Sequence, residues 1–494
     1  MKNSCQAGLS GFAWTGEAVV IILAFMVADD ELARICLVTN RRLLALYAGA
    51  LLLCAGSAFG QWAVPEELQA QAEALDEVQL AFVTSGAVLE FIAERQLEHE
   101  LATRDAESLR ALMDDLLALA DRMGYDPERD MGAAPLNLTS EEFGDPMPTP
   151  PLLRDFEREP GPFSVHRYMF PESGVPTFGG ANVAIWPEDL VAGNVDVAII
   201  GVPSNAGSGR RVSENGPNEM RGLNTIAVTD VQSLVEPFET LSVVDYGDFS
   251  MDMFSVHRSI GHVAAMVAET AETGAIPMMV GGDTSMLYPG VSGVARVHGN
   301  GSFGLLHFSA HADAERNDDH TISDRQAVFR LLNEGVVEGG ETVQVGLRGL
   351  SVDADTLQWL RDNNVRYHTM AEFRQRGSEA VLQRILQEVE SGPDAYFVSI
   401  DVSVIDPVEM IAAGRAAYDG LGIEQVTRTL RHVCAAKEIV GFEITDLAPM
   451  LDWSRLSVMH ANAVLNACLV GVALRKAGLD PDYVHPLALD HGQQ

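Results

Sequence analysis

The feature that most restricts the fold is a series of short apolar segments that alternate with helical patterns between residues 196 and 475. Each apolar segment has five or six residues, which is the length of a buried strand. The expected strands cover 196–201, 241–245, 276–280, 303–308, 342–346, 364–368, 395–400 and 438–442. The clearest helical patterns cover 255–273, 353–363, 379–390, 423–434 and 457–475. Strands joined by helical crossovers predict a three-layer α/β/α domain with a mostly parallel eight-stranded sheet.

Polar residues follow three of the expected strands at the point where each should end. The three turns cover 281–285, 309–313 and 401–403. Open α/β folds place their chemistry at the carboxyl ends of strands. The turn Ser309-Ala-His311-Ala-Asp313 carries an imidazole and a carboxylate two residues apart, and both groups are ligands of divalent cations. The sequence therefore raises the question of whether these turns form a metal site.

The charge of the chain excludes two classes of partner. The formal net charge is −37, with 70 acidic and 33 basic residues. Such a surface repels nucleic acid and anionic membranes. It would attract a cationic substrate, but its simpler role is to keep the protein soluble.

The first 61 residues predict an export signal. Arg41 and Arg42 precede an apolar run over 43–58 that ends in small residues, as in a secretory signal peptide. The run is too short and too rich in Gly and Ala for a stable membrane span. Forty residues precede the signal, so we expect a mis-assigned leader and a true start downstream, for example at Met26. The prediction is a periplasmic or secreted protein; a cytoplasmic protein and an N-terminal membrane anchor are the alternatives.

Four further segments follow the leader. Residues 62–123 predict an acidic helical extension, and residues 124–165 a linker rich in Pro and acidic residues. The α/β domain is expected over 166–480, with a tail over 481–494. Cys434 and Cys468 fall in helical patterns and are expected to be core thiols, since no cysteine pair has the spacing of a disulfide framework.

The α/β region resembles the ureohydrolases, the family of arginase and agmatinase, over about 170–475. Ser173-Gly-Val-Pro-Thr-Phe178 resembles an access loop of agmatinases, so the agmatinase branch fits better than arginase. Val195-Asp-Val-Ala-Ile-Ile-Gly-Val-Pro203 and Asp245-Tyr-Gly-Asp248 resemble the first two strand ends. The three turns described above match in order and spacing, as does Gly441-Phe-Glu-Ile-Thr-Asp446.

The resemblance implies a metal-dependent hydrolase of guanidino compounds that forms a trimer or hexamer. The family's reaction yields an amine and urea. A pair of Mn²⁺ ions supplies a bridging hydroxide, because two adjacent cations lower the pKa of a shared water and stabilise the tetrahedral intermediate. The implied small-molecule ligand is a guanidino or polyamine-type compound, and the implied protein partners are further ureohydrolase subunits.

Three of the family's six metal-ligand positions are substituted in this chain. His311, Asp313 and Asp401 match the family. Thr284 stands in place of a histidine, and Ser309 and Ser403 stand in place of carboxylates. A serine hydroxyl is a poor ligand beside a carboxylate, so two tightly held ions are not expected, and at most one ion could be held by the three remaining ligands.

The resemblance also suggests catalytic positions. Asp313 is one of them, and His320 lies near a proton-handling histidine of the family. Asp446 falls where the family has a glutamate that pairs with the guanidinium, with a side chain shorter by about 1.5 Å. A non-catalytic interpretation remains open: His311 could be hydrogen-bonded in its turn, and the aspartates could pair with an arginine such as Arg210 or Arg211.

Two functional classes follow. In the favoured one, the protein is a non-catalytic or regulatory paralogue that joins a mixed oligomer or binds guanidino compounds or polyamines. In the other, it is an active hydrolase of C–N bonds in linear amidines that uses a single or atypical metal ion.

Overall fold

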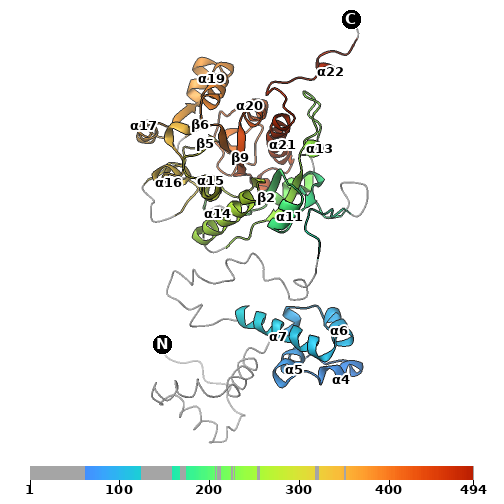
Figure 1. Cartoon of the computed structure of the whole chain (residues 1–494). Coiled ribbons are helices and arrows are strands. Elements are labelled where there is room, and N and C mark those ends of the chain that lie inside the picture. Colours follow the sequence, from blue (N-terminus) through green and yellow to red (C-terminus); the bar gives the residue numbers. More distant parts are fainter. Residues whose placement is uncertain are drawn as a thin grey trace, which may run out of the picture. The chain divides into compact units, whose positions relative to one another are not determined.

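A computed structural model describes residues 62–123, 158–166, 174–205, 207–208, 213–223, 226, 228–252, 256–316, 322–349 and 352–492 (Figure 1). The chain divides into two compact units. The first contains residues 1–125 and 148–157, and the second contains residues 126–147 and 158–494. The predicted signal peptide lies outside the described residues.

The first unit is helical over its described part, as the sequence predicts. Its elements are η1 (Glu66–Leu68), α4 (Gln69–Ala72), α5 (Glu77–Thr84), η2 (Ala87–Glu90), α6 (Glu94–Thr103) and α7 (Ala106–Met123). Phe82, Leu97 and Met113 belong to a core of its own. Asp76 caps α5 by accepting hydrogen bonds from the N–H groups of Val78 and Gln79.

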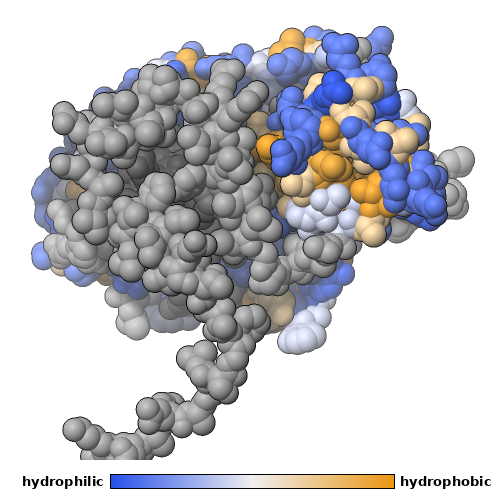
Figure 2. Space-filling model, turned by 90° about the horizontal axis from the view of Figure 1, so that it is seen from below, coloured by the Kyte–Doolittle hydropathy of each residue, from blue (hydrophilic) through white to orange (hydrophobic). Residues whose placement is uncertain are grey.

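The described surface seen from below is mixed in polarity. Figure 2 shows patches of hydrophobic side chains among hydrophilic ones there. Leu80, Leu89 and Phe91 of the first unit are only partly buried against its core. The excess of acidic residues therefore does not make this unit uniformly polar.

The second unit is built on a nine-stranded sheet whose paired strands all run parallel. The strands are β1 (Asn182–Val183), β2 (Val197–Gly201), β3 (Val243–Asp248), β4 (Ile276–Val280), β5 (Gly304–Phe308), β6 (Thr342–Leu347), β7 (Arg366–Thr369), β8 (Ala395–Asp401) and β9 (Glu438–Thr445). Their order is β1-β3-β2-β4-β9-β8-β5-β6-β7. The fold class is confirmed, with one strand more than predicted. The two residues of β1 pair with Val244 and Asp245 of β3 and are too few to show a periodic pattern.

Helices cover both faces of the sheet. They are η3 (Phe178–Gly180), α11 (Pro187–Ala192), α12 (Gly216–Leu223), α13 (Pro237–Thr240), α14 (Val256–Glu272), η4 (Thr284–Met286), α15 (Leu287–His298), α16 (Ala327–Asn333), η5 (Gly339–Glu341), α17 (Ala354–Asp362), α18 (Met370–Arg376), α19 (Ser378–Glu390), η6 (Val402–Val404), α20 (Ile423–Ala436), η7 (Pro449–Leu451), α21 (Leu456–Lys476) and α22 (Pro486–Leu489). Figure 1 shows α14 and α15 on one side of the sheet and α20 and α21 on the other. Val197 and Ile199 of β2 face the core with α20 and α21, whereas Ala198 and Ile200 face the core with α14 and α15. This alternation is the period of a strand that is buried on both faces.

Helix α21 is the one helix among the described residues that is long and apolar enough to cross a membrane. Most of that apolar stretch is buried inside the second unit, where it packs against α20. We therefore assign α21 as a core helix.

The second unit begins before the predicted boundary at residue 166. Arg158 donates from Nη2 to both carboxylate oxygens of Asp189, at 2.7 and 2.6 Å. The same carboxylate accepts the N–H groups of Gly161, Ile185 and Trp186 at 2.8–3.1 Å. The last residues of the predicted linker are thus hydrogen-bonded to Asp189 in α11.

Asp189 gives a pH-dependent prediction. Its burial alone would raise the pKa, but Arg158 and the three N–H groups outweigh burial and lower the pKa from 3.8 to about 2. Because the folded-state pKa is below the unfolded one, this stabilisation is present above pH 4 and is lost as the pH falls toward 2. We expect Asp189→Asn to lower the free energy of unfolding by about 2 kcal/mol near pH 7, and by progressively less below pH 4. Urea unfolding at a series of pH values measures this; a constant difference from pH 7 down to pH 2.5 would contradict it.

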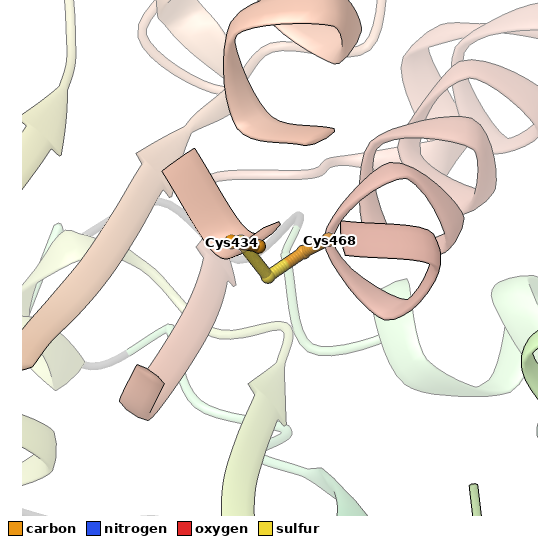
Figure 3. Close-up of a disulfide and its surroundings, with 2 residues drawn as sticks. All are labelled: Cys434 and Cys468. Carbon is orange, nitrogen blue, oxygen red and sulfur yellow. A yellow bond between two sulfur atoms is a disulfide. The ribbon is translucent and has the colours of Figure 1, made fainter. Parts of the chain in front are cut away.

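A disulfide joins the two largest helices on one face of the sheet. Cys434 of α20 and Cys468 of α21 are bonded, with their Cα atoms 5.3 Å apart (Figure 3). Both residues are fully buried, as predicted, but the prediction of two separate thiols was wrong. A spacing of 34 residues carries no disulfide signature by itself. Only the packing of the two helices brings the sulfur atoms together.

Removing the disulfide should destabilise the second unit. We expect Cys434→Ala/Cys468→Ala to lower the free energy of unfolding by about 3–4 kcal/mol, because the bond restricts a loop of this length in the unfolded chain. Urea unfolding with and without dithiothreitol measures the effect. The reduced wild type should approach the variant, and the variant should not respond to the reductant. A wild type that unfolds identically in both conditions would show that the bond adds no stability.

Candidate functional site

The three predicted turns meet at the carboxyl edge of the sheet around one carboxylate. Asp401 ends β8 and is fully buried. Its Oδ2 accepts hydrogen bonds from Thr284 Oγ1 at 3.1 Å and from Ser309 Oγ at 3.0 Å. Its Oδ1 accepts from the N–H of Ser403 at 2.8 Å. The substituted positions therefore still converge, with hydroxyl groups that donate to the remaining carboxylate.

The guanidinium of Arg415 lies between the two remaining carboxylates of the predicted metal site. Its Nη1 donates to Asp313 Oδ1 at 2.8 Å, and its Nη2 donates to Asp401 Oδ2 at 2.8 Å. The same Nη2 lies 2.7 Å from Thr284 Oγ1, and Nε forms an ion-pair contact of 3.3 Å with Asp324 Oδ2. Only 9% of the Arg415 side chain is exposed. A cation that belongs to the chain thus occupies the space between the three turns.

A second buried arginine positions the loop that carries Arg415. Arg348 follows β6, and its guanidinium donates to the carbonyl groups of Ser403 at 2.6 Å, Ala417 at 3.0 Å and Tyr418 at 2.9 Å. These hydrogen bonds hold the chain before and after Arg415 in the sequence.

The backbone next to Arg415 is fixed by Asp446. The N–H of Arg415 donates to Asp446 Oδ2 at 2.7 Å, and the N–H of Gly414 donates to the Asp446 carbonyl at 2.9 Å. A Cβ atom at residue 414 would lie 2.6 Å from Asp446 Oδ1, so the loop requires glycine there. Asp446 itself has a left-handed backbone, with φ of 65°. The Asp446 carboxylate thus accepts from the backbone of the loop, while its own N–H donates to the carbonyl of Gly282 at 2.8 Å; its pairing with a substrate guanidinium stays a prediction.

His311 is held by the same loop. Its Nε2 lies 2.8 Å from the carbonyl oxygen of Arg415. Because a carbonyl only accepts, Nε2 is the donor in this contact, and in a neutral ring the lone pair lies on Nδ1. This contact joins His311 to a loop 104 residues away, and within its own turn the N–H of His311 donates to Ser309 Oγ at 3.0 Å. The role of His311 stays a prediction.

The electrostatics single out Asp313 and Asp401 as the charged partners of Arg415. Burial would raise the pKa of each, but the Arg415 charge outweighs burial, and both pKa values lie below their ordinary range. The two carboxylates, followed by those of Asp446 and Asp324, raise the pKa of Arg415 well above its usual value despite its burial. The cluster therefore contains a stable guanidinium with two ionised carboxylates.

Two other buried carboxyl groups of the site have raised pKa values. Burial and the neighbouring charges of Asp313 and Asp283 raise the pKa of Asp324 to about 7, against the opposing effect of Arg415. Burial, followed by the charge of Asp401, raises the pKa of Asp446. Near neutral pH Asp446 favours its neutral form and Asp324 carries only part of a negative charge, so the two full charges that face the guanidinium are those of Asp313 and Asp401.

A buried polar chain beneath the site was missed by sequence reasoning. His307 Nε2 lies 3.4 Å from Asp313 Oδ2, and its Nδ1 lies 3.0 Å from Ser399 Oγ. The Ser399 hydroxyl donates to Glu443 Oε1 at 2.6 Å. Burial, with the charges of Asp401 and Asp313, raises the pKa of Glu443 to about 8. His307, Ser399 and Glu443 lie opposite one another in the register of β5, β8 and β9. Polar side chains within these otherwise apolar strands were the available sequence signal.

Arg415 was the decisive residue that sequence reasoning missed. It is isolated within Ile411-Ala-Ala-Gly414-Arg415-Ala-Ala417, a run of small and apolar residues. A long cationic side chain in such a run was the available signal. The arginines named as candidate partners, Arg210 and Arg211, lie outside the described residues.

His320 lies outside the described residues, as does Ser173 at the start of the predicted access loop. Two further aspartates near the site, Asp283 and Asp406, accept backbone N–H groups: Asp283 those of Ser208 and Ser285, and Asp406 those of Val408 and Gly420.

The donor set does not fit a pair of divalent cations. The three substituted ligand positions contribute hydroxyl groups, and the two carboxylates are already paired with Arg415. Across the described part of the chain, no group of three or more His, Cys, Asp or Glu side chains is placed to hold a metal ion. Hard divalent cations prefer several carboxylate oxygens, and this site offers two that are already neutralised.

Comparison with known proteins identifies the family. The model of the arginase family matches residues 195–471, which is more than half of the chain and contains every predicted metal-ligand position. The chain belongs to the arginase family.

The relatives of this chain include an agmatinase and a guanidinopropionase. The chain is 26% identical to the mitochondrial agmatinase of Gallus gallus over 58% of this chain and 83% of that protein. It is 29% identical to the guanidinopropionase of Pseudomonas aeruginosa over 57% of this chain and 86% of that protein. The formiminoglutamase of Trypanosoma cruzi, solved with Mn²⁺, shares the fold with a TM-score of 0.52 at 21% identity, covering 57% of this chain and 95% of that one. The first unit, residues 62–123, lies outside the family match.

Proposed function

We propose that this arginase-family protein is a non-catalytic paralogue whose ancestral reaction was metal-dependent hydrolysis of a guanidino compound to an amine and urea. One observation carries the proposal. The Nη atoms of Arg415 lie 2.8 Å from both Asp313 and Asp401, the two carboxylates that remain of the predicted ligand set.

The charge of the site supports this proposal. The family reaction, with Mn²⁺ as its expected cofactor, uses two divalent cations offset by four carboxylates. Here Ser309 and Ser403 remove two carboxylates, and the single positive charge of Arg415 faces the other two. A metal ion that entered would have to displace a buried arginine whose carboxylate partners are desolvated, and breaking such a pair costs about 3–5 kcal/mol.

The alternative is an active hydrolase of linear amidines with a single or atypical ion. The presence of His311, Asp313 and Asp401 favours it, since one imidazole and two carboxylates can hold one divalent cation. It requires the Arg415 side chain to move away from Asp313 and Asp401, because its Nη atoms donate to both carboxylates.

Urea release separates the two functions. The purified full-length protein is incubated with Mn²⁺ and, separately, with agmatine, arginine, 3-guanidinopropionate and 4-guanidinobutyrate. We expect no urea above the buffer blank, while an agmatinase assayed in parallel releases it. Metal-dependent urea release from any one of these compounds would overturn the non-catalytic assignment.

Assembly with a second ureohydrolase-fold subunit is a further proposal. Val408, Met450 and Trp453 are 81%, 62% and 93% exposed on the two loops that follow β8 and β9. The N–H of Ala448 in one loop donates to the carbonyl of Ala412 in the other at 2.7 Å, so the loops are adjacent. Exposed apolar side chains of this size suit an interface with a second ureohydrolase-fold subunit. Size-exclusion chromatography with light scattering tests the oligomer, and a monomer would contradict it.

Export is supported by the Cys434–Cys468 disulfide, because such bonds persist in oxidising compartments. Fractionation of expressing cells tests this proposal. Recovery of the full-length protein in the cytoplasmic fraction, with both cysteines reduced, would contradict export.

A further inference from the structure

We propose that the pocket formed by the three turns is a guanidinium-binding site whose resident occupant is the chain's own Arg415. Removing the Arg415 side chain should therefore leave a site that binds a free guanidinium cation. The inference goes beyond the non-catalytic role, since it assigns a ligand class and rests on the contacts of Arg415 alone.

The first support is the match between the pocket and a planar, forked cation. Asp313 and Asp401 come from the ends of two adjacent strands, β5 and β8, and each accepts from a different Nη atom at 2.8 Å. Thr284 Oγ1 and the Asp324 carbonyl oxygen add contacts at 2.7 and 3.4 Å. A guanidinium presents its N–H donors in a rigid fork that suits paired carboxylates, whereas an ammonium is a compact point charge.

The second support is that the pocket is held by contacts that do not involve the Arg415 side chain. Asp401 is oriented by the N–H of Ser403 and by the hydroxyl of Ser309. Asp313 has a left-handed backbone with φ of 47°, its carbonyl accepts the N–H of Val328 at 3.0 Å, and its carboxylate contacts His307. The two carboxylates should keep their places when the arginine is truncated.

The third support is that the two carboxylates are buried while the arginine between them keeps partial contact with solvent. Asp401 and Asp313 are 0% and 4% exposed, so their charges are not satisfied by bulk water. The Arg415 side chain keeps 9% of its surface exposed, so part of the occupant contacts solvent. Truncation at Cβ would extend that opening to the two carboxylates, and a small cation could enter there.

Chemical rescue of Arg415→Ala tests the proposal in the full-length protein. Thermal unfolding is measured with increasing guanidinium chloride in the low-millimolar range, with sodium chloride, tetramethylammonium chloride and urea as matched controls. We expect the midpoint of Arg415→Ala to fall by roughly 4–7 °C. Guanidinium should raise it in a saturable manner, the controls should not, and the wild-type midpoint should stay unchanged.

Two outcomes would overturn the proposal in this experiment. One is the absence of a saturable, guanidinium-specific rise in the variant. The other is an equal rise with sodium or tetramethylammonium chloride, which would define a general cation site. Urea release by the wild type would refute the non-catalytic role but would leave the rescue result standing, so the two failures are distinguishable.

Arg415→Lys keeps the test decisive if Arg415→Ala does not fold. Lysine keeps the positive charge but cannot donate to both carboxylates with the same fork. We expect a lower unfolding midpoint than that of the wild type and no rise with guanidinium, because the ammonium stays in the pocket. A variant as stable as the wild type would show that the fork contacts do not matter and would overturn the proposal.

Discussion

Asp401→Asn lowers the free energy of unfolding by about 3–5 kcal/mol, because it removes one charge of a buried ion pair and leaves the other in place. Asp401 is fully buried and accepts from Arg415, Ser309, Thr284 and the N–H of Ser403. An asparagine keeps the shape but cannot accept at both terminal atoms. Arg415 then remains buried with Asp313 as its main charged partner.

The pH dependence of this effect has a defined sign. Arg415 holds the pKa of Asp401 below its ordinary value, even though burial opposes this. A lowered folded-state pKa stabilises the fold above the unfolded pKa, and that stabilisation is lost as the pH falls through the folded-state value. The difference between wild type and Asp401→Asn is therefore expected to be full at neutral pH and to shrink in acid.

Urea unfolding of Asp401→Asn and Asp419→Asn measures the effect against a matched control. Asp419 forms an ion pair with Arg374 in which the two side chains are 35% and 63% exposed. Exposed pairs contribute little, so the control should stay within about 0.5 kcal/mol of the wild type. A double-mutant cycle with Arg415→Ala should give a coupling of at least 1 kcal/mol. If Asp401→Asn changes stability no more than Asp419→Asn, the buried pair is not an organising contact of the site.

Restoring the family's ligand types is expected to restore metal binding only when Arg415 is also removed. Thr284→His, Ser309→Asp and Ser403→Asp together rebuild the six positions that the resemblance implies. In the triple variant the new carboxylates face a guanidinium that already lies between Asp313 and Asp401. They should pair with it, and we expect no stoichiometric Mn²⁺.

The fourth change, Arg415→Ala, removes the competing cation. The quadruple variant has four carboxylates and two imidazoles facing the pocket, which is a ligand set suited to hard divalent cations. We expect stoichiometric Mn²⁺ after dialysis, measured by inductively coupled plasma mass spectrometry. Equal Mn²⁺ in the triple and quadruple variants would show that Arg415 does not compete with metal.

Much of the fold is readable from the sequence because buried parallel strands leave a local signal. Segment 276–280 is a continuous apolar run and 395–400 is apolar except for Ser399, and the structure places β4 and β8 there. Strand β1 was missed because two residues cannot show a period. The disulfide was missed because only the packing of α20 against α21 brings Cys434 and Cys468 within bonding distance.

The candidate site was predictable in its outline but not in its occupant. The turns ending in Thr284, Asp313 and Ser403 follow strands whose carboxyl ends meet at one edge, so their convergence follows from topology. Arg415 comes from an irregular loop with no periodic pattern. Its position depends on Arg348, which follows β6, and on Asp446, which follows β9; both are distant from the loop in sequence.

The metal content of the purified wild-type protein tests the central claim most directly. The protein is expressed in medium supplemented with Mn²⁺, dialysed, and analysed for Mn, Ni and Zn by inductively coupled plasma mass spectrometry. With Arg415 as the cation between Asp313 and Asp401, we predict far less than one metal ion per chain. One or more equivalents of Mn, Ni or Zn per chain, lost when Asp401 is replaced by asparagine, would contradict the account.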